Sequence, residues 1–269
     1  MAISLKTAGT WARVVADPSS VTIPGTPADG DRMFLFATWK TYTVTVTDPT
    51  DWTPIGTVFA DGTTGAGNGT GSVAVMAWYK DWVTGDANPS LNWSAAPTEA
   101  HAVVQLWTKD SGDAWSTPEE YTIGYAGAST NFTYAFSGVT GSTGGVIMAL
   151  VGFRDDSATM TRTTTAIAQS AGSMSFTGNY VESPATHFNS TTGQDMSGDL
   201  GHRFIGNNGT ATTLNVTGTT SAAETGASKL VVQKFTTPVS AALTGTITAG
   251  VNEGDIVTGG KTLIITLTN

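Results

Sequence analysis

Apolar residues are concentrated in five short runs of the chain, separated by segments rich in Gly, Thr, Ser, Ala and Asp. In the run 73–79, both alternating sets of side chains are apolar. A strand with one face in water alternates apolar with polar residues, so this run predicts a strand that is covered on both faces. Seven residues are too few for a typical helix. We therefore interpret 73–79 as the central strand of a β-sandwich.

The other four runs have the same character and predict further buried strands. They span 33–39, 103–107, 146–153 and 230–235. Weaker alternation predicts half-exposed strands between the runs, at 10–16, 21–23, 41–47, 53–59, 90–94, 121–125, 131–136, 160–168, 173–180 and 212–216. Strands at this spacing with turn residues between them are typical of an antiparallel sandwich or jelly roll. We find no amphipathic helix of more than two turns, and 193–206 is expected to be a long loop.

Two segments of the chain repeat one pattern. Residues 21–37 and 139–150 each contain a short β start, a glycine turn and a long apolar strand. The sequence therefore predicts two halves with similar hairpins, as a jelly roll has.

The pattern changes at Pro238. The preceding residues, 1–237, are predicted to form one jelly-roll-like β-sandwich domain. Residues 238–269 contain two or three alternating segments, too few strands to bury their own core. We expect this short C-terminal β extension to pair with another chain, to dock on the main domain, or to begin a second small β domain.

Composition excludes several classes of protein. The 269 residues include no Cys, so the chain has no disulfide framework and no thiolate ligand, which suits assembly in a reducing cytoplasm. The net charge is −9 and the 12 basic residues are scattered, which argues against nucleic-acid binding. The N-terminus has no apolar signal core, and no window approaches 18 apolar residues, so we expect neither secretion by the usual route nor membrane insertion.

Candidate catalytic residues do not form a recognisable motif. The histidines are His101, His187 and His202, and Asp195 and Asp199 lie near the last two. No His-x-x-x-His or Gly-x-Ser-x-Gly spacing accompanies them. The sequence therefore predicts no catalytic residue, no metal site and no cofactor, and the protein is not expected to be an enzyme.

Pairs of carboxylates are interpreted as turn residues, because none follows the spacing of a calcium loop. These pairs are Asp29/Asp31, Asp110/Asp113, Glu119/Glu120 and Asp155/Asp156. A glycosidase pair stays open, since its two carboxylates can be far apart in sequence. The segment 259–262, Gly-Gly-Lys-Thr, lacks the first glycine and the following helix of a phosphate-binding loop.

The tryptophans fall into two groups. Trp78, Trp93 and Trp107 lie in predicted strands and are expected in the core. Trp52, Trp82 and Trp115 are placed at strand ends or in loops, where an exposed ring could stack on a sugar or contact a neighbouring subunit. Packing against the core is the favoured alternative for all three.

Several short motifs, in their order and spacing, resemble a pattern found in phage and prophage structural proteins. They are Val21-Thr-Ile-Pro, Ala28-Asp-Gly-Asp, Asp51-Trp-Thr-Pro-Ile-Gly, Val75-Met-Ala-Trp-Tyr-Lys, Ala102-Val-Val-Gln-Leu-Trp and Lys229-Leu-Val-Val-Gln-Lys. The resemblance covers about residues 10–235. Asp51 is a departure, because Gly-Trp is usual at this point. Residues 242–267 look like the opening of a small β-domain common in phage fibre and tail proteins.

The resemblance implies a structural component of a phage virion surface, either a head decoration or spike or a tail fibre. It would mediate assembly contacts with other capsid or tail proteins and host adhesion, as a homo-oligomer assembled in the host cytoplasm. A lectin-like carbohydrate-binding module is the alternative, with Trp52, Trp82 and Trp115 as its contacts. A glycan-degrading enzyme is the third hypothesis, and it requires two carboxylates that converge in a groove.

Overall fold

The computed structural model is all-β. It describes residues 3–40, 43–61, 73–110, 113–126, 130–154, 162–184, 188–189, 196–221 and 225–236, and these contain strands, turns and coil but no helix. The predicted fold class, an antiparallel sandwich, is confirmed. The chain divides into two units, 1–238 and 239–269. The second unit lies outside the described residues, so the predicted C-terminal β extension stays a prediction.

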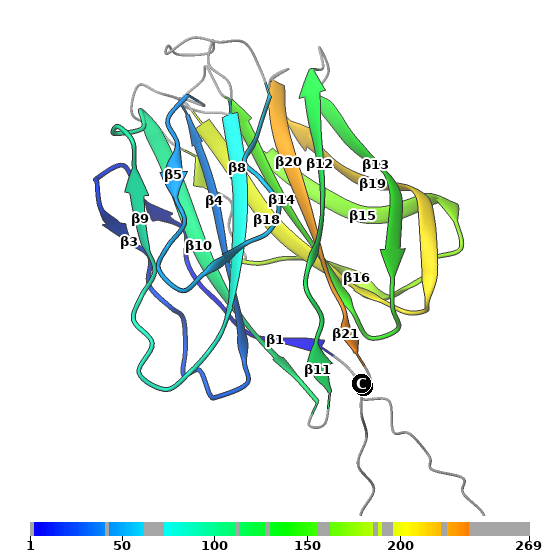
Figure 1. The fold of residues 1–269 in the computed structure, drawn as a ribbon. Helices are drawn as coiled ribbons and strands as arrows, with labels where there is room; N and C mark the ends of the chain where they lie inside the picture. The colour runs from blue at the N-terminus through cyan, green and yellow to red at the C-terminus, as the bar shows by residue number, and fades with distance from the viewer. Residues whose placement is uncertain are drawn as a thin grey trace, which may run out of the picture. The chain divides into compact units, whose positions relative to one another are not determined.

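The first half of the chain forms an inner and an outer sheet, both antiparallel (Figure 1). The first inner sheet has, in spatial order, β1 (Ile3–Ala8), β10 (Glu99–Lys109), β4 (Arg32–Lys40), β8 (Val73–Asp81) and β6 (Thr53–Pro54), with β2 (Ala12–Arg13) on β10 and β7 (Phe59–Asp61) on β8. The first outer sheet has β3 (Ser19–Ser20), β9 (Ser90–Trp93) and β5 (Val46–Thr47).

The second half repeats this arrangement. The second inner sheet has β12 (Glu119–Ala126), β20 (Thr225–Gln233), β14 (Val146–Arg154), β18 (Met196–Ile205) and β16 (Phe176–Glu182), with β17 (Phe188–Asn189) on β18. The second outer sheet has β13 (Asn131–Gly141), β19 (Gly209–Thr220) and β15 (Arg162–Gly172). A short ribbon of β11 (Ala114–Trp115) and β21 (Phe235–Thr236) joins the link between the halves to the end of the second half.

The two halves have the same strand order. We leave out β2 and number the remaining strand positions of each half one to eight along the chain. Each inner sheet then has the order 1-8-3-6-5 and each outer sheet has the order 2-7-4. Position five is split in both halves into two short strands that pair with position six, β6 and β7 in one and β16 and β17 in the other. The repeated segments 21–37 and 139–150 both lead from position two to position three. Each half is thus a sandwich of its own within residues 3–236, whereas the sequence predicted one sandwich made of two halves with similar hairpins.

Three apolar clusters hold the four sheets together. Between the inner sheets, Phe34 and Phe36 of β4 pack in one cluster with Met148 and Leu150 of β14. The opposite face of each inner sheet packs against an outer sheet and its connections. The inner strands β4, β8, β10, β14 and β20 are therefore covered on both faces, which explains why their sequences are largely apolar.

All five apolar runs lie in inner sheets, as predicted. Three of them are β4, β8 and β10, and two are β14 and β20. The central position belongs to β4 rather than to the predicted run 73–79, because β8 has only the short strands β6 and β7 on its second side. The first strand, β1, comes before the predicted first strand 10–16, of which only β2 forms.

The predicted loop over 193–206 is wrong, because Met196–Ile205 is β18, a strand with neighbours on both sides. Glycines take the place of apolar residues in β18, so its sequence lacks the apolar pattern of a buried strand. A Cβ atom added to Gly198 would lie 2.1 Å from Phe188, and one added to Gly201 would lie 2.1 Å from the Tyr180 hydroxyl. Aromatic side chains from β17 and β16 therefore cover this strand where its own sequence has no side chain.

Buried charges connect the two halves. Lys229 of β20 is fully buried and donates hydrogen bonds to the carbonyl oxygens of Ile55 and Thr57, at 2.9 and 3.0 Å, and to the Glu120 carboxylate. Arg32 of β4 is 4% exposed and pairs with Asp81 of β8. It also donates to the carbonyl oxygen of Ser116, at 2.6 Å, and to Oε1 of Gln233, at 2.9 Å. Both cations therefore join polar groups of one half to those of the other.

We predict that Glu120→Ala lowers the free energy of unfolding by about 3 kcal/mol, since it leaves the buried Lys229 ammonium without its counter-ion. Adding Lys229→Met to this variant should restore part of the loss, because the unpaired buried charge is the costly feature. Urea unfolding of the two variants and the parent protein measures both effects. Equal stability of Glu120→Ala and the parent would show that the ion pair contributes nothing.

Candidate functional site

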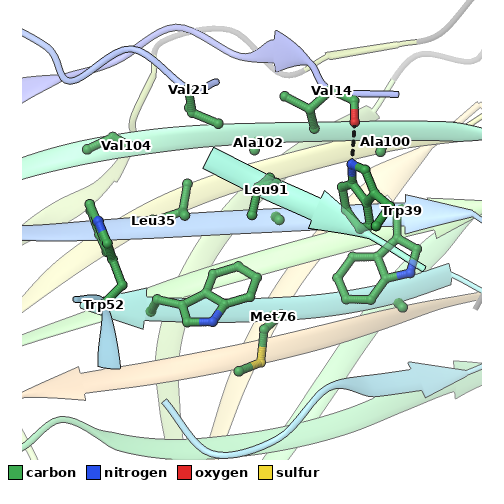
Figure 2. Close-up of a cluster of buried hydrophobic side chains, with 14 of the residues drawn as sticks. Val14, Val21, Leu35, Trp39, Trp52, Met76, Leu91, Ala100, Ala102 and Val104 are labelled. Atoms are coloured by element: carbon green, nitrogen blue, oxygen red, sulfur yellow. Dashed lines mark hydrogen bonds between the residues drawn. The ribbon is translucent and has the colours of Figure 1, made fainter. Parts of the chain in front are cut away.

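Trp52 is buried, in agreement with the favoured alternative of packing against the core, so it is not the exposed ring that a glycan or subunit contact would use. It is 6% exposed and belongs to the cluster between the first inner and outer sheets. Figure 2 shows Trp52 at one end of this cluster, near Leu35. In the same cluster the Trp93 indole donates a hydrogen bond to the Val14 carbonyl oxygen, at 2.9 Å. Trp52 therefore stabilises the core and presents little of its ring to a partner.

Trp82 and Trp115 are partly exposed and already have contacts within the chain. Trp82 packs against the same cluster as Trp52. The Trp115 indole donates a hydrogen bond to the Gly30 carbonyl oxygen, at 2.9 Å, and the Arg32 guanidinium lies 5.1 Å from its ring centre. The three tryptophans do not form one platform, and a role in glycan or subunit contact stays a prediction for Trp82 and Trp115. Trp78, Trp93 and Trp107 are buried, as expected.

A surface pocket of about 330 Å³ lies beside Trp52. The turn between β5 and β6 contributes Asp51, the connection between β8 and β9 contributes Asp86 and Asn88, and β8 contributes Lys80. The pocket therefore combines an aromatic edge with charged and amide groups, within the described part of the chain. This combination makes it the candidate functional site.

Lys80 lies between the two carboxylates of the pocket. Its Nζ is 2.8 Å from Oδ1 of Asp86 and 3.8 Å from Oδ2 of Asp51. Burial by itself raises the pKa of Asp86, but hydrogen bonds from Lys80 and from the Val83 amide outweigh it and lower the pKa below its ordinary value. Asp86 is therefore held ionised and paired, which suits a structural anchor for Lys80 and not a general acid.

Asp51 has a different environment from Asp86. Its backbone φ is 63°, in the left-handed region, where Asp is tolerated but glycine is favoured. The side chain is 75% exposed, and its distance to Lys80 is too long for a hydrogen bond. The turn places this carboxylate at the pocket with its hydrogen-bonding capacity unused among the described residues.

His101 has a structural environment. Its Nε2 lies 2.7 Å from Oε1 of Glu99, and its ring stacks on Phe188 with centres 3.9 Å apart. Arg13 also donates two charge-assisted bonds to this Glu99 carboxylate, from Nε to Oε1 at 2.9 Å and from Nη2 to Oε2 at 2.8 Å. Burial alone raises the pKa of Glu99, but the bonds from His101 and Arg13 outweigh it and lower the pKa. The buried Glu99 carboxylate at the start of β10 is thus held by His101 and by the partly exposed Arg13.

His202 of β18 is buried between aromatic rings. Its ring centre lies 5.1 Å from that of Trp107 and 5.3 Å from that of Phe204, and its Nδ1 has no hydrogen-bond partner among the described residues. Burial lowers its pKa from 6.5 to about 4. His187 and Asp195 lie outside the described residues, while Asp199 is buried on β18 beside Val151 of β14.

The carboxylate pairs of the described residues serve turns and ion pairs. Asp31 accepts bonds from Lys6 and from the Ala28 amide, and Asp29 accepts from the amide and hydroxyl of Thr84. The Asp113 amide donates a bond to the Asp110 carbonyl oxygen, at 3.4 Å. Residues 111–112 and the pair Asp155/Asp156 lie outside the described residues. Glu119 pairs with Lys234. Over the described ranges, no three His, Asp or Glu side chains converge as a metal site would require.

Comparison of the chain with family models, with curated proteins and with solved structures finds no match. In the part of the chain that the structure describes, no helix could cross a membrane.

The sequence did not single out the pocket residues Asp51, Asp86 and Asn88. Asp51 was noted only as a departure from the resembled motif, with no role assigned to it. Its meaning depends on the backbone conformation and on the connection 82–89, which approaches it only in the folded protein.

We predict that protonation of His202 destabilises the protein in acid. The folded-state pKa of about 4 lies below the unfolded value of 6.5, so the unfolded chain binds the proton first as pH falls. Stability from this group is complete above 6.5 and is lost as pH falls toward 4. Between about pH 7.5 and about pH 5 this amounts to about 2 kcal/mol.

The variant His202→Met isolates this effect, because the same carboxylates titrate in both proteins. Urea unfolding at the two pH values should give a drop that is about 2 kcal/mol smaller in the variant than in the parent. An equal drop in both proteins would contradict the assignment.

Proposed function

We propose that this chain is a structural component of a phage virion surface, built as two jelly-roll-like sandwiches packed through their inner sheets. The observation that carries the proposal is the strand order shared by both halves, 1-8-3-6 in the inner sheet and 2-7-4 in the outer sheet. This order resembles that of an eight-stranded jelly roll, with position five added to the inner sheet. Jelly rolls are an architecture of viral capsid and lectin domains. The step from fold to function is an analogy, and the motifs shared with phage structural proteins support it.

The mechanical properties of the fold suit such a role. Both faces of each inner sheet are covered, and hydrogen bonds from the side chains of Arg32 and Lys229 join the two halves. A body of this kind keeps its shape while its loops make contacts. The partners in this proposal are copies of the chain and other capsid or tail proteins, with residues 238–269 as the segment that completes a sheet in a neighbour.

The pocket beside Trp52 favours the lectin-like alternative as a second function, because it offers hydrogen-bonding groups of both kinds beside an aromatic edge. It also contains two carboxylates, as the hypothesis of a glycan-degrading enzyme requires. Glycoside hydrolysis needs one carboxylic acid with a raised pKa. The lowered pKa of Asp86 favours binding over hydrolysis at this pocket, and the proposed function includes no catalysis.

Two measurements on the full chain test the proposal. Light scattering should give a closed homo-oligomer, as is usual for symmetric virion components. Mass spectrometry and antibody labelling of purified phage particles from cells that express the chain should find it on the particle surface. A monomer that binds no capsid or tail component would contradict the proposal.

A further inference from the structure

The two halves of the molecule provide an internal comparison for the pocket. In the first half, position six is joined to position seven by 82–89, and position four to position five by 48–52. In the second half the equivalent connections are only 206–208 and 173–175. There, the Asn207 side chain accepts a bond from the Ser175 amide and donates one to the Ser173 carbonyl oxygen, which closes the two turns on each other. In the first half, by contrast, residues of the two longer connections line the pocket.

The lengthened connections hold polar groups that the fold does not use. Asn88 accepts a hydrogen bond from the Ile23 amide through Oδ1, at 3.0 Å, which orients its side chain. Its Nδ2 has no hydrogen-bond partner among the described residues. Asp51 offers carboxylate oxygens from a strained backbone conformation, and such conformations concentrate at functional sites. Lys80 has three donors, of which Asp86 takes one at 2.8 Å.

Charge selects the class of ligand. Asp51 and Asp86 disfavour an anion, while the ammonium of Lys80 disfavours a cation. A neutral ligand with several hydroxyl groups fits the mixture, because each hydroxyl both donates and accepts. An acceptor such as Asp51 and a donor such as the Asn88 amide can then serve adjacent hydroxyls.

We infer that this pocket is a binding site for a neutral saccharide, with the Asp51 carboxylate as acceptor and the Asn88 amide as donor. The inference deepens the adhesion role within the proposed function, but the site is defined by its own chemistry and can be tested without a virion. The saccharide can come from free sugars or from a cell-surface polysaccharide, and both present the same hydroxyl groups.

The experiment follows backbone, Asn side-chain and Trp indole signals of the full chain by ¹H–¹⁵N NMR. The probes are a panel of neutral monosaccharides, a neutral bacterial surface polysaccharide, and, as charged probes, methylammonium and inorganic phosphate. We expect the Asn88 side-chain and nearby amide signals to shift with one or more sugars, with a dissociation constant on the order of 1 mM for a monosaccharide. A response to the polysaccharide alone would identify a surface glycan as the ligand.

Two variants remove the hydrogen-bonding groups and keep the fold. Asp51→Gly removes the acceptor and relieves the backbone, so it should weaken binding at least tenfold without lowering the melting temperature. Asn88→Asp keeps the oxygen that Ile23 needs and removes the donor, and should weaken binding similarly. The matched control is Asn179→Asp, which adds the same charge at an exposed position of β16 in the second half.

Three results would overturn the inference. They are no response to any sugar or to the polysaccharide, a stronger response to methylammonium or phosphate than to sugars, and sugar binding that survives both Asp51→Gly and Asn88→Asp. Because particle association is measured separately, loss of the saccharide site and failure of the virion role are distinguishable.

Discussion

The contact between the two inner sheets is the constraint on which the rest of the structure depends. Phe34 and Phe36 of β4 pack there with Met148 and Leu150 of β14, and all four side chains are fully buried. Burial of each such side chain stabilises the fold by about 2 kcal/mol. The sheets also approach closely, since a Cβ atom on Gly152 would lie 2.4 Å from the Thr38 hydroxyl. Each inner sheet then has its opposite apolar face exposed unless an outer sheet covers it.

Buried cations specify how the halves meet. An apolar contact alone allows sliding between sheets, whereas Lys229 reaches two carbonyl oxygens and one carboxylate at defined positions. A buried ammonium is costly to desolvate, so it is satisfied only in the arrangement that supplies these partners. We therefore interpret Lys229 and Arg32 as groups that select one arrangement of the halves, more than as sources of stability.

The comparison of the two halves distinguishes the sheets common to both from the connections that form the candidate site. Both halves share the inner and outer sheets, and they differ in the connections that carry the pocket. This division is common in β-sandwiches, where a rigid core tolerates changes in loop length and the loops carry recognition. Asp51 is an example of a loop residue of this kind. Its backbone is in the left-handed region, and its exposed carboxylate lies at the pocket.

The sequence by itself determined the class of fold and the inner strands, because a run that is apolar on both alternating sides can only be buried on both faces. It also indicated the two similar halves through 21–37 and 139–150. Only the tertiary structure decided the rest. The glycines of β18 become a strand because Phe188 and Tyr180 cover them, and Trp52 is buried because it packs in one cluster with side chains of β4, β8, β9 and β10. A local sequence pattern indicates the secondary structure and burial that a segment favours. The pocket depends on which loops the sheets bring together, and these loops are far apart in the sequence.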